Sequence, residues 1–227
     1  MKVEEYNLID KIYGNFISFQ EKIKPLLNLH NQNTKIVVLE IGCGTGISTE
    51  IILNSRKEIK LTCIDISKEM IEFASQTLSS FSNVNFIISD ALEFIQKQKS
   101  KDFDIVVSAY TVHNFTVKYR QKLFTEIFRI LKPNGLFINA DKFVSDNKDI
   151  QIKGLKYRIG TYVDFLIKKN KLDLLKEWTK HYIDDQRPDK LLKFDKTLEV
   201  LKQIGFDKVE YIYKSELEML GILIATK

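Results

Sequence analysis

A turn with three alternating glycines is the part of the chain whose residue types and spacing favour chemistry. An apolar run is followed by Gly42, Gly44 and Gly46. Glycine has no Cβ, so it permits positive φ and lets a ligand approach the backbone closely. Residues 45–55 then begin like a helix, whose first N–H groups are free to point toward the turn. The pattern predicts a small-molecule site at the carboxyl end of a strand, where open α/β sheets bind ligands.

The spacing of these glycines argues against a dinucleotide as the ligand. The dinucleotide fingerprint G-x-G-x-x-G needs its third glycine at position 47, which is occupied by Ile47. The acid Glu40, just before the turn, is not part of that fingerprint either. A second apolar run ends in Asp65 and a third leads to Asp90. An acid at the tip of the second strand can accept hydrogen bonds from both ribose hydroxyls, so a nucleoside remains the expected ligand.

With these companions, residues 36–140 resemble the class I S-adenosylmethionine-dependent methyltransferases, whose first motif is E/D-x-G-x-G-x-G. Glu40 and the three glycines match this motif at every required position. The resemblance implies S-adenosylmethionine as the cofactor and S-adenosylhomocysteine as the product, with Asp90 facing the adenine amino group. It implies cofactor contacts from Glu40, Gly42, Cys43, Gly44, Gly46, Asp65, Ile66, Met70, Asp90, Ala91 and Ser108.

The elements that must position these residues alternate between strands and helices, which indicates a parallel sheet. We expect strands at 36–41, 59–64, 84–88, 103–108, 135–140, 207–213 and 217–226. Helices are expected at about 4–29, 46–54, 91–98, 117–131 and 194–204, and another starts with Ser67 as its N-cap. The resemblance adds a Rossmann-like α/β fold with a seven-stranded sheet in the order 3-2-1-4-5-7-6, the last strand antiparallel, and helices on both faces.

An aromatic, charged segment at about 145–193 separates the fifth strand from the last helix. Its pattern is helical, and it is too long for an idle connection. We therefore expect one methyltransferase domain over residues 1–227, with a lid formed by about 1–30 and 145–193. Tyr13, Tyr157, Arg158 and Trp178 in these segments are the candidate substrate-binding residues. Arginine and tyrosine suit an acidic or phenolic acceptor, whereas helix packing or a surface ion pair is the alternative role.

Catalysis by this family needs few side chains, because a sulfonium methyl already has a good leaving group. The enzyme mainly aligns the acceptor for in-line displacement and excludes water. A base is needed when the acceptor is a hydroxyl, an acidic carbon or a charged amine. His113, after the fourth strand, and His181, in the lid, are the candidate catalytic residues. Packing over the cofactor is the alternative for His113, and a surface position is the alternative for His181. The dispersed histidines have no metal-ligand spacing, so no metal is expected.

The acceptor is expected to be a small molecule that takes the methyl on oxygen, nitrogen or a carboxylate. The fourth strand ends in Ser108-Ala109-Tyr110-Thr111, which differs from the [D/N/S]-P-P-[Y/F/W] motif of enzymes that methylate adenine amino groups or glutamine amides. No Pro-Cys nucleophile of cytosine C5 chemistry is present. One alternative is an RNA-modifying methyltransferase. Another is a carboxy-S-adenosylmethionine synthase, to which Asp141-Lys142-Phe143 is weakly similar. A non-catalytic cofactor-binding protein and a dehydrogenase are further alternatives.

Composition supports a packed globular protein. The chain has 227 residues, of which 44% are hydrophobic, and a net charge of +5. Lys168, Lys169 and Lys171 form a small cluster, which we interpret as a solvated helix face; nucleic acid is therefore not the favoured partner. No apolar run is long enough to cross a membrane, and the polar N-terminus does not resemble a secretory signal. The two cysteines lack a C-x-x-C pattern, so we expect a cytoplasmic protein. Nothing in the pattern indicates an oligomeric state.

Overall fold

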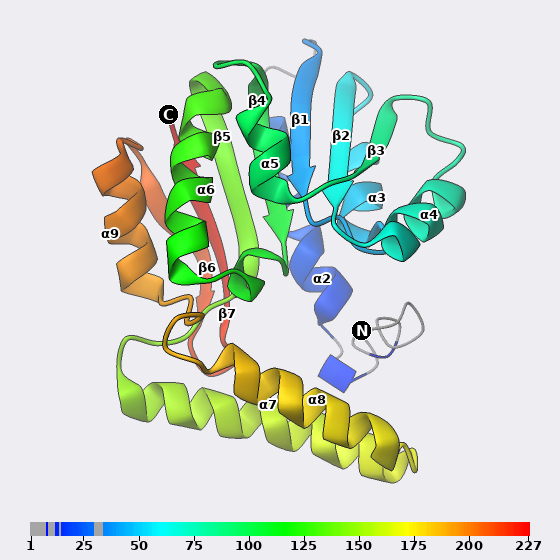
Figure 1. Cartoon of the computed structure of the whole chain (residues 1–227), viewed down its shortest axis with the longest axis vertical. Helices are drawn as coiled ribbons and strands as arrows, with labels where there is room; N and C mark the ends of the chain where they lie inside the picture. The colour runs from blue at the N-terminus through cyan, green and yellow to red at the C-terminus, as the bar shows by residue number, and fades with distance from the viewer. Residues whose placement is uncertain (1–7, 9–11, 14, 30–33) are drawn as a thin grey trace.

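The fold is built on a seven-stranded sheet, whose strand order is β3-β2-β1-β4-β5-β7-β6 (Figure 1). The computed structural model describes residues 8, 12–13, 15–29 and 34–227. Its strands are β1 (Ile36–Ile41), β2 (Ile59–Asp65), β3 (Val84–Ile88), β4 (Phe103–Ala109), β5 (Leu131–Lys142), β6 (Val209–Ser215) and β7 (Leu220–Thr226). The first five strands pair in parallel, and β7 is antiparallel to both β5 and β6. The expected Rossmann-like order, with its antiparallel last strand, is confirmed.

Helices cover both faces of the sheet, because alternate strand residues are apolar on each side. On one face lie α5 (Ala91–Gln96), α6 (Val117–Ile130) and α9 (Phe194–Ile204), whose apolar side chains pack with one set of strand residues. On the other face lie α2 (Phe16–Glu21), α3 (Ile47–Leu53) and α4 (Lys68–Thr77). Two short 3-10 turns, η1 (Leu26–Asn28) and η2 (Val112–Asn114), complete the elements around the sheet. The two cores hold the strands rigidly enough to place the residues at their tips.

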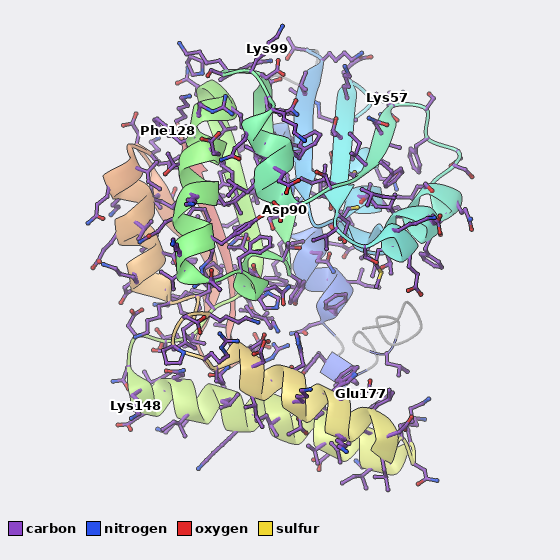
Figure 2. The ribbon with its side chains drawn as sticks, viewed as in Figure 1. Lys57, Asp90, Lys99, Phe128, Lys148 and Glu177 are labelled. Atoms are coloured by element: carbon purple, nitrogen blue, oxygen red, sulfur yellow. The ribbon has the colours of Figure 1, made fainter. Side chains whose placement is uncertain are left out.

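Two further helices lie across the carboxyl ends of the parallel strands. Figure 1 shows α7 (Lys148–Lys168) and α8 (Leu172–Asp185) running side by side beneath the sheet. In Figure 2, Lys148 and Glu177 mark these helices, while Lys57 and Lys99 mark the opposite end of the sheet. The helices have their own apolar cluster, centred on buried Tyr162 and Trp178. The helical pattern read from residues 145–193 thus corresponds to two helices at the ligand-binding edge.

The observed bounds differ little from the expected ones. Ser67 is the N-cap of α4, as expected, and its Oγ accepts a hydrogen bond from the Met70 N–H. The fifth strand begins at Leu131 rather than at 135, because Leu131 already pairs with Phe103 before the register shifts. Asn134, with a φ of 61°, lies in that irregular stretch. The described helices include none that combines the length and apolarity needed to span a membrane. Within the expected helix at about 4–29, residues 4–7, 9–11 and 14 lie outside the described residues. The prediction of one continuous helix is wrong for the rest, because the chain there is divided into α2, a stretch of turns and η1.

A buried arginine holds the chain that returns from α8 to the sheet. The Arg120 guanidinium, on α6, donates hydrogen bonds to the carbonyls of Phe115, Lys190 and Leu191 at 2.7–2.9 Å. Its side chain is almost fully buried. Three carbonyls that are shielded from water thus depend on one side chain for their donors.

Replacing this arginine should therefore be costly. We expect Arg120→Leu to lower the free energy of unfolding by about 2–4 kcal/mol, since it leaves buried carbonyls without donors. Exposed Arg187, which pairs with Asp184 and Asp189 at the surface, is the matched control, and Arg187→Leu should cost less than about 1 kcal/mol. Urea denaturation measures both. Equal losses for the two variants would contradict the assigned role of Arg120.

Candidate active site

A cavity of about 380 Å³ opens at the carboxyl ends of the strands, between the sheet and the α7–α8 pair. Side chains from both regions line it: Tyr13, Phe16, Gly44, Asp65, Ser67, Met70, Tyr110, His113, Asn114, Lys142, Arg158, Trp178, His181 and Tyr182. A smaller hollow beside it is lined by residues 42–45, and it shares Phe16, Gly44 and Tyr110 with the cavity. The glycine turn and the aromatic segment, far apart in sequence, therefore meet around one space.

The three glycines of the turn differ in what surrounds them, although all have positive φ. A Cβ on Gly42 would lie 2.2 Å from the Thr111 hydroxyl oxygen. A Cβ on Gly46 would meet Leu78 and Ala74 at 3.0–3.2 Å. A Cβ on Gly44 would meet no atom within 4 Å. Gly42 and Gly46 are thus required by packing within the protein, and Gly44 alone leaves its Cα face open to the cavity.

Asp65 lies at the tip of β2 and points its carboxylate toward the turn. Its Oδ2 accepts a hydrogen bond from the Gly44 N–H at 2.9 Å, and its Oδ1 accepts one from the Ser67 N–H at 2.9 Å. Both oxygens belong to a side chain that lines the cavity. A carboxylate oxygen has two lone-pair sites, so each still has capacity for a ligand hydroxyl.

Glu40 is fully buried beneath the turn and is not among the residues that line the cavity. Its carboxylate oxygens accept hydrogen bonds from the Ser48 hydroxyl at 2.5 Å and the Thr49 hydroxyl at 2.6 Å. Burial raises the pKa of Glu40, whereas these hydrogen bonds oppose the rise. Glu40, on β1, thus binds the first turn of α3, and these hydrogen bonds fix the glycine turn that connects the two elements.

His113 forms a buried pair with Asp141, whose side chain lies at the same edge of the sheet. The His113 Nδ1 lies 2.6 Å from the Asp141 Oδ1, and the His113 backbone N–H donates to Oδ2 at 3.0 Å. Burial, together with the Lys142 cation, lowers the pKa of His113 despite the nearby Asp141. The imidazole is therefore neutral at pH 7. Because Asp141 accepts the Nδ1 proton, Nε2 is left as the proton acceptor.

His181, Asp185 and Lys142 form a polar cluster next to this pair. His113, His181 and Asp185 each place one ligand-type atom within 4.8 Å of the others. The Lys142 Nζ lies 2.7 Å from the Asp185 Oδ2 and supplies a positive charge there. Burial, with the Lys142 cation, lowers the pKa of His181. The separation of the histidines in sequence does not predict this proximity, because α8 folds back over the sheet edge.

Arg158, Tyr13 and Tyr182 form the wall of the cavity on the α7–α8 side. The Arg158 guanidinium stacks over the Tyr13 ring at 4.2 Å and donates to the Glu218 carbonyl at 2.8 Å. The hydroxyls of Tyr13 and Tyr182 are hydrogen-bonded to each other. Burial would raise the pKa of Tyr182, but the cations of Arg158 and Lys142 outweigh it and lower that pKa. This wall is therefore electropositive and aromatic.

Tyr110 follows β4 with a φ of 51°, which is uncommon for a bulky residue. Its ring packs against Phe16, with centroids 4.6 Å apart, and against Phe19 at 5.4 Å. These contacts with α2 stabilise a backbone conformation that costs about 1–3 kcal/mol. The residue lines both the cavity and the smaller hollow. Strained residues of this kind cluster at ligand-binding sites.

The structure brings many of the predicted site residues to the cavity. Gly44, Asp65 and Met70 line it with His113, His181, Tyr13, Arg158 and Trp178, while Gly42 and Cys43 line the adjoining hollow. The other predicted site residues line neither the cavity nor the hollow: Glu40, Gly46, Ile66, Asp90, Ala91, Ser108 and Tyr157. Tyr157 is 46% exposed, and Ser108 is fully buried within β4.

Asp90 lies at the carboxyl end of β3, at the start of α5 (Figure 2). It caps that helix by accepting from the N–H groups of Leu92 and Glu93, and the Tyr119 hydroxyl donates to it at 2.8 Å. Ile66, next to Asp65, is 75% exposed. An apolar side chain so open to solvent at the rim of a binding edge is available to a flat, apolar ligand group.

Sequence reasoning did not single out Tyr110, Tyr182 or Phe16 as site residues. Tyr182 follows His181 directly, so its position beside a candidate catalytic residue was the signal for it. Asp141 and Lys142 directly follow the expected fifth strand, but their bonds to His113 and Asp185 depend on η2 and α8 packing against β5. The spacing of residues in the sequence does not predict that η2 and α8 pack against β5.

The different surroundings of two glycines predict different costs on substitution. Gly42→Ala should lower the free energy of unfolding by about 2–5 kcal/mol, because it adds a clash with Thr111 to the left-handed strain. Gly44→Ala should cost only about 1–2 kcal/mol, since its φ of 53° is strained but its Cβ has space. Chemical denaturation of both variants measures this difference. Equal losses would show that the turn is not packed as described.

Comparison with known proteins finds similarity to methyltransferases. Residues 38–135 match a family model described as a methyltransferase domain. A malonyl-[acyl-carrier protein] O-methyltransferase 2 of Ilyobacter polytropus is 32% identical over 130 residues, which are 56% of this chain and 48% of that protein. A demethylmenaquinone methyltransferase of Leptospira interrogans is 36% identical over 115 residues, 49% of this chain and 45% of that one. The chain thus spans about half the length of these curated relatives.

A third relative matches along nearly the whole chain. The carboxy-S-adenosyl-L-methionine synthase of Nautilia profundicola is 27% identical over 222 residues, which cover 93% of this chain and 80% of that protein. Among solved structures, an S-adenosylmethionine-dependent methyltransferase from Methanococcus maripaludis, described as putative in its own title, has a TM-score of 0.64 at 20% identity. That match covers 99% of this chain and 91% of the other, and it supports the fold alone. Together, the matched domain and the strand order show that residues 38–135 are similar to a methyltransferase domain and that the chain has a Rossmann-like sheet.

Proposed function

We propose that the protein transfers a methyl group from S-adenosylmethionine to a small-molecule acceptor that binds in the cavity. The observation that carries this proposal is that one cavity is lined both by Gly44 and Asp65, from the nucleoside-binding strand tips, and by buried His113. The relatives named as methyltransferases of small or carrier-bound molecules support the same activity. Nucleic acid is not the favoured partner, since the cavity is small and is lined by several aromatic side chains.

The residues present fit the cofactor. The open Cα face of Gly44 gives a ligand access to the backbone, and a side chain there would fill the space. We assign the ribose hydroxyls to Asp65, whose carboxylate is held in place by two backbone N–H groups. Exposed Ile66 and the cap of α5 at Asp90 and Ala91 are assigned to the adenine. Glu40, Gly46 and Ser108 then serve the site indirectly, through the packing of the turn and the sheet.

The chain's own residues align and deprotonate the acceptor in this proposal. When bound, S-adenosylmethionine supplies an activated methyl group on its sulfonium. The neutral His113 accepts the acceptor's proton at Nε2, while Asp141 holds Nδ1–H and stabilises the resulting imidazolium. This assistance suits a hydroxyl or an acidic carbon. A general base of this type contributes about 10²–10⁴ in rate.

We further propose that α7, α8 and the N-terminal residues form a lid over one catalytic domain. Trp178 and Tyr182 of α8 and Arg158 of α7 line the cavity, and Tyr13 contacts both Arg158 and Tyr182. A lid of aromatic side chains excludes water from the reacting groups, which strengthens the electrostatic interactions inside. Two buried free cysteines, Cys43 and Cys63, are consistent with a cytoplasmic location.

The role of His113 predicts how its variants behave. His113→Gln should lower kcat about 10²–10⁴-fold and change the affinity for S-adenosylhomocysteine less than about threefold. In the wild type, kcat/KM should rise with pH through a midpoint below 6.5, because burial lowers the pKa of the imidazole that must be unprotonated. Asp141 opposes that shift, so Asp141→Asn should move the midpoint lower still and reduce kcat. Rate profiles between pH 5 and 8 measure both.

His181→Gln is the control for this assignment, since His181 lines the same cavity but has no carboxylate on its ring nitrogen as close as that of His113. If His181→Gln loses more activity than His113→Gln, the base is His181. If neither variant alters the pH profile, no histidine deprotonates the acceptor.

The cofactor assignment is tested by binding. Calorimetry should show S-adenosylhomocysteine binding to the wild type but no NAD binding. Asp65→Asn should weaken that binding about 10–100-fold, because hydrogen bonds to a charged group are worth about 1.5–3 kcal/mol. Asn85, on the neighbouring β3, provides the control Asn85→Ala, which should leave the affinity unchanged. Turnover with RNA but with no small-molecule pool would refute the proposed acceptor class.

A second candidate function is the synthesis of carboxy-S-adenosyl-L-methionine. It is favoured by one specific observation, the match to such a synthase over 93% of this chain and 80% of that protein. The two candidates differ in what the purified protein carries and makes. Mass spectrometry of the nucleoside released from the protein should find S-adenosylmethionine or S-adenosylhomocysteine. A carboxylated nucleoside instead would favour the second candidate.

A further inference from the structure

Arg158 is a buried cation that has no acidic partner among the described residues. It is 5% exposed, and no carboxylate of those residues lies within ion-pair distance of its guanidinium. Its hydrogen-bond acceptors are the Glu218 carbonyl at 2.8 Å and the Tyr182 hydroxyl at 3.5 Å, and neither is a carboxylate. Burying a charge is costly unless it is paired. An arginine in this position therefore needs an anion from a ligand to offset the free-energy cost of its burial.

The side chains around Arg158 fix the plane of its guanidinium. The Tyr13 ring lies over one face with 4.2 Å between the guanidinium carbon and the ring centroid. The Glu218 carbonyl accepts from one terminal nitrogen, and no described group is recorded as accepting from the other. A fixed, planar guanidinium with an unused edge matches the geometry of a carboxylate.

The charges of the side chains that line the cavity also favour an anionic ligand. Among the charged residues that line it, the cations are Arg158 and Lys142, and the acid is Asp65. The Asp65 carboxylate belongs to the glycine turn, where two backbone N–H groups already bind it. The Lys142 ammonium is balanced by Asp185, which lines an adjoining hollow with Arg158 rather than the cavity itself. The wall made by α7 and α8 thus presents uncompensated positive charge to a ligand.

We propose that Arg158 binds a carboxylate carried by the methyl acceptor, which is an aromatic or unsaturated acid. This inference rests on the proposed function, and it names the class of acceptor for the same site. The rings of Tyr13, Trp178 and Tyr182 surround the position and suit a flat apolar body. Arg158 and His113 line the same cavity, so Arg158 can hold the carboxylate while the hydroxyl or acidic carbon that takes the methyl group faces His113.

The experiment uses benzoate and benzamide as a matched pair of probes. Both have the same size and ring, and only benzoate carries the charge. The protein saturated with S-adenosylhomocysteine should bind benzoate at least tenfold more tightly than benzamide, as measured by ligand-detected NMR titration. Arg158→Gln should abolish this preference, with a loss of about 10–100-fold in benzoate affinity. Arg187→Gln, at an exposed arginine, is the control and should retain the preference.

A second arm distinguishes the acceptor's carboxylate from that of the cofactor's methionyl group. If Arg158 binds the cofactor, Arg158→Gln should weaken S-adenosylhomocysteine but leave 5′-methylthioadenosine, which lacks the amino-acid group, unaffected. That result overturns the proposal, as does equal binding of benzoate and benzamide by the wild type. Arg158→Lys keeps the charge without the planar fork, and it covers the case in which the glutamine variant does not fold. Failure of the wild type to bind S-adenosylhomocysteine would refute the proposed function instead.

Discussion

The buried carboxylate of Asp141 is the interaction on which the acceptor side of the cavity depends. It ends β5, accepts two hydrogen bonds from His113 and accepts a third from the Lys142 backbone N–H at 2.7 Å. These bonds tie η2, which follows β4, to the neighbouring strand. A buried acid is tolerated only when its lone pairs are used in this way. The position of His113, and with it the shape of the cavity, follows from satisfying that one charge.

The cofactor side and the acceptor side of the site are built on different principles. The glycine turn is held by contacts within a few residues and between adjacent strands: Glu40 with Ser48 and Thr49, and Asp65 with Gly44. The acceptor side joins segments far apart in the chain, such as Tyr13 with Tyr182. Local contacts hold the glycine turn in place, whereas contacts between distant segments determine the shape of the rest of the cavity. This division explains why one fold serves many acceptors.

The same division decides how much could be predicted from the sequence. The parallel pairing and the Ser67 cap follow from local patterns, the strand order is implied by the family resemblance, and all three are confirmed. Gly44 and Asp65 were singled out from equally local motifs, and both line the cavity. The pairing of His113 with Asp141 and the burial of Arg158 without a carboxylate partner among the described residues could not be predicted, because both depend on how segments distant in sequence pack at the sheet edge. Hydrophobic periodicity predicts that such helices form, but it does not encode where they pack.

Lys142 links two parts of the molecule through opposite ends of one residue. Its backbone N–H bonds to Asp141 beside His113, while its ammonium bonds to Asp185 at the end of α8. The proton affinity of His113 responds to both Lys142 and Asp185. A change in α8 that alters Asp185 therefore changes the proton affinity of the His113 imidazole, even where the altered residue does not contact the ligand. In evolutionary terms, a substitution in α8 that reshapes this cavity can also change the proton affinity of His113, so the two properties diverge together.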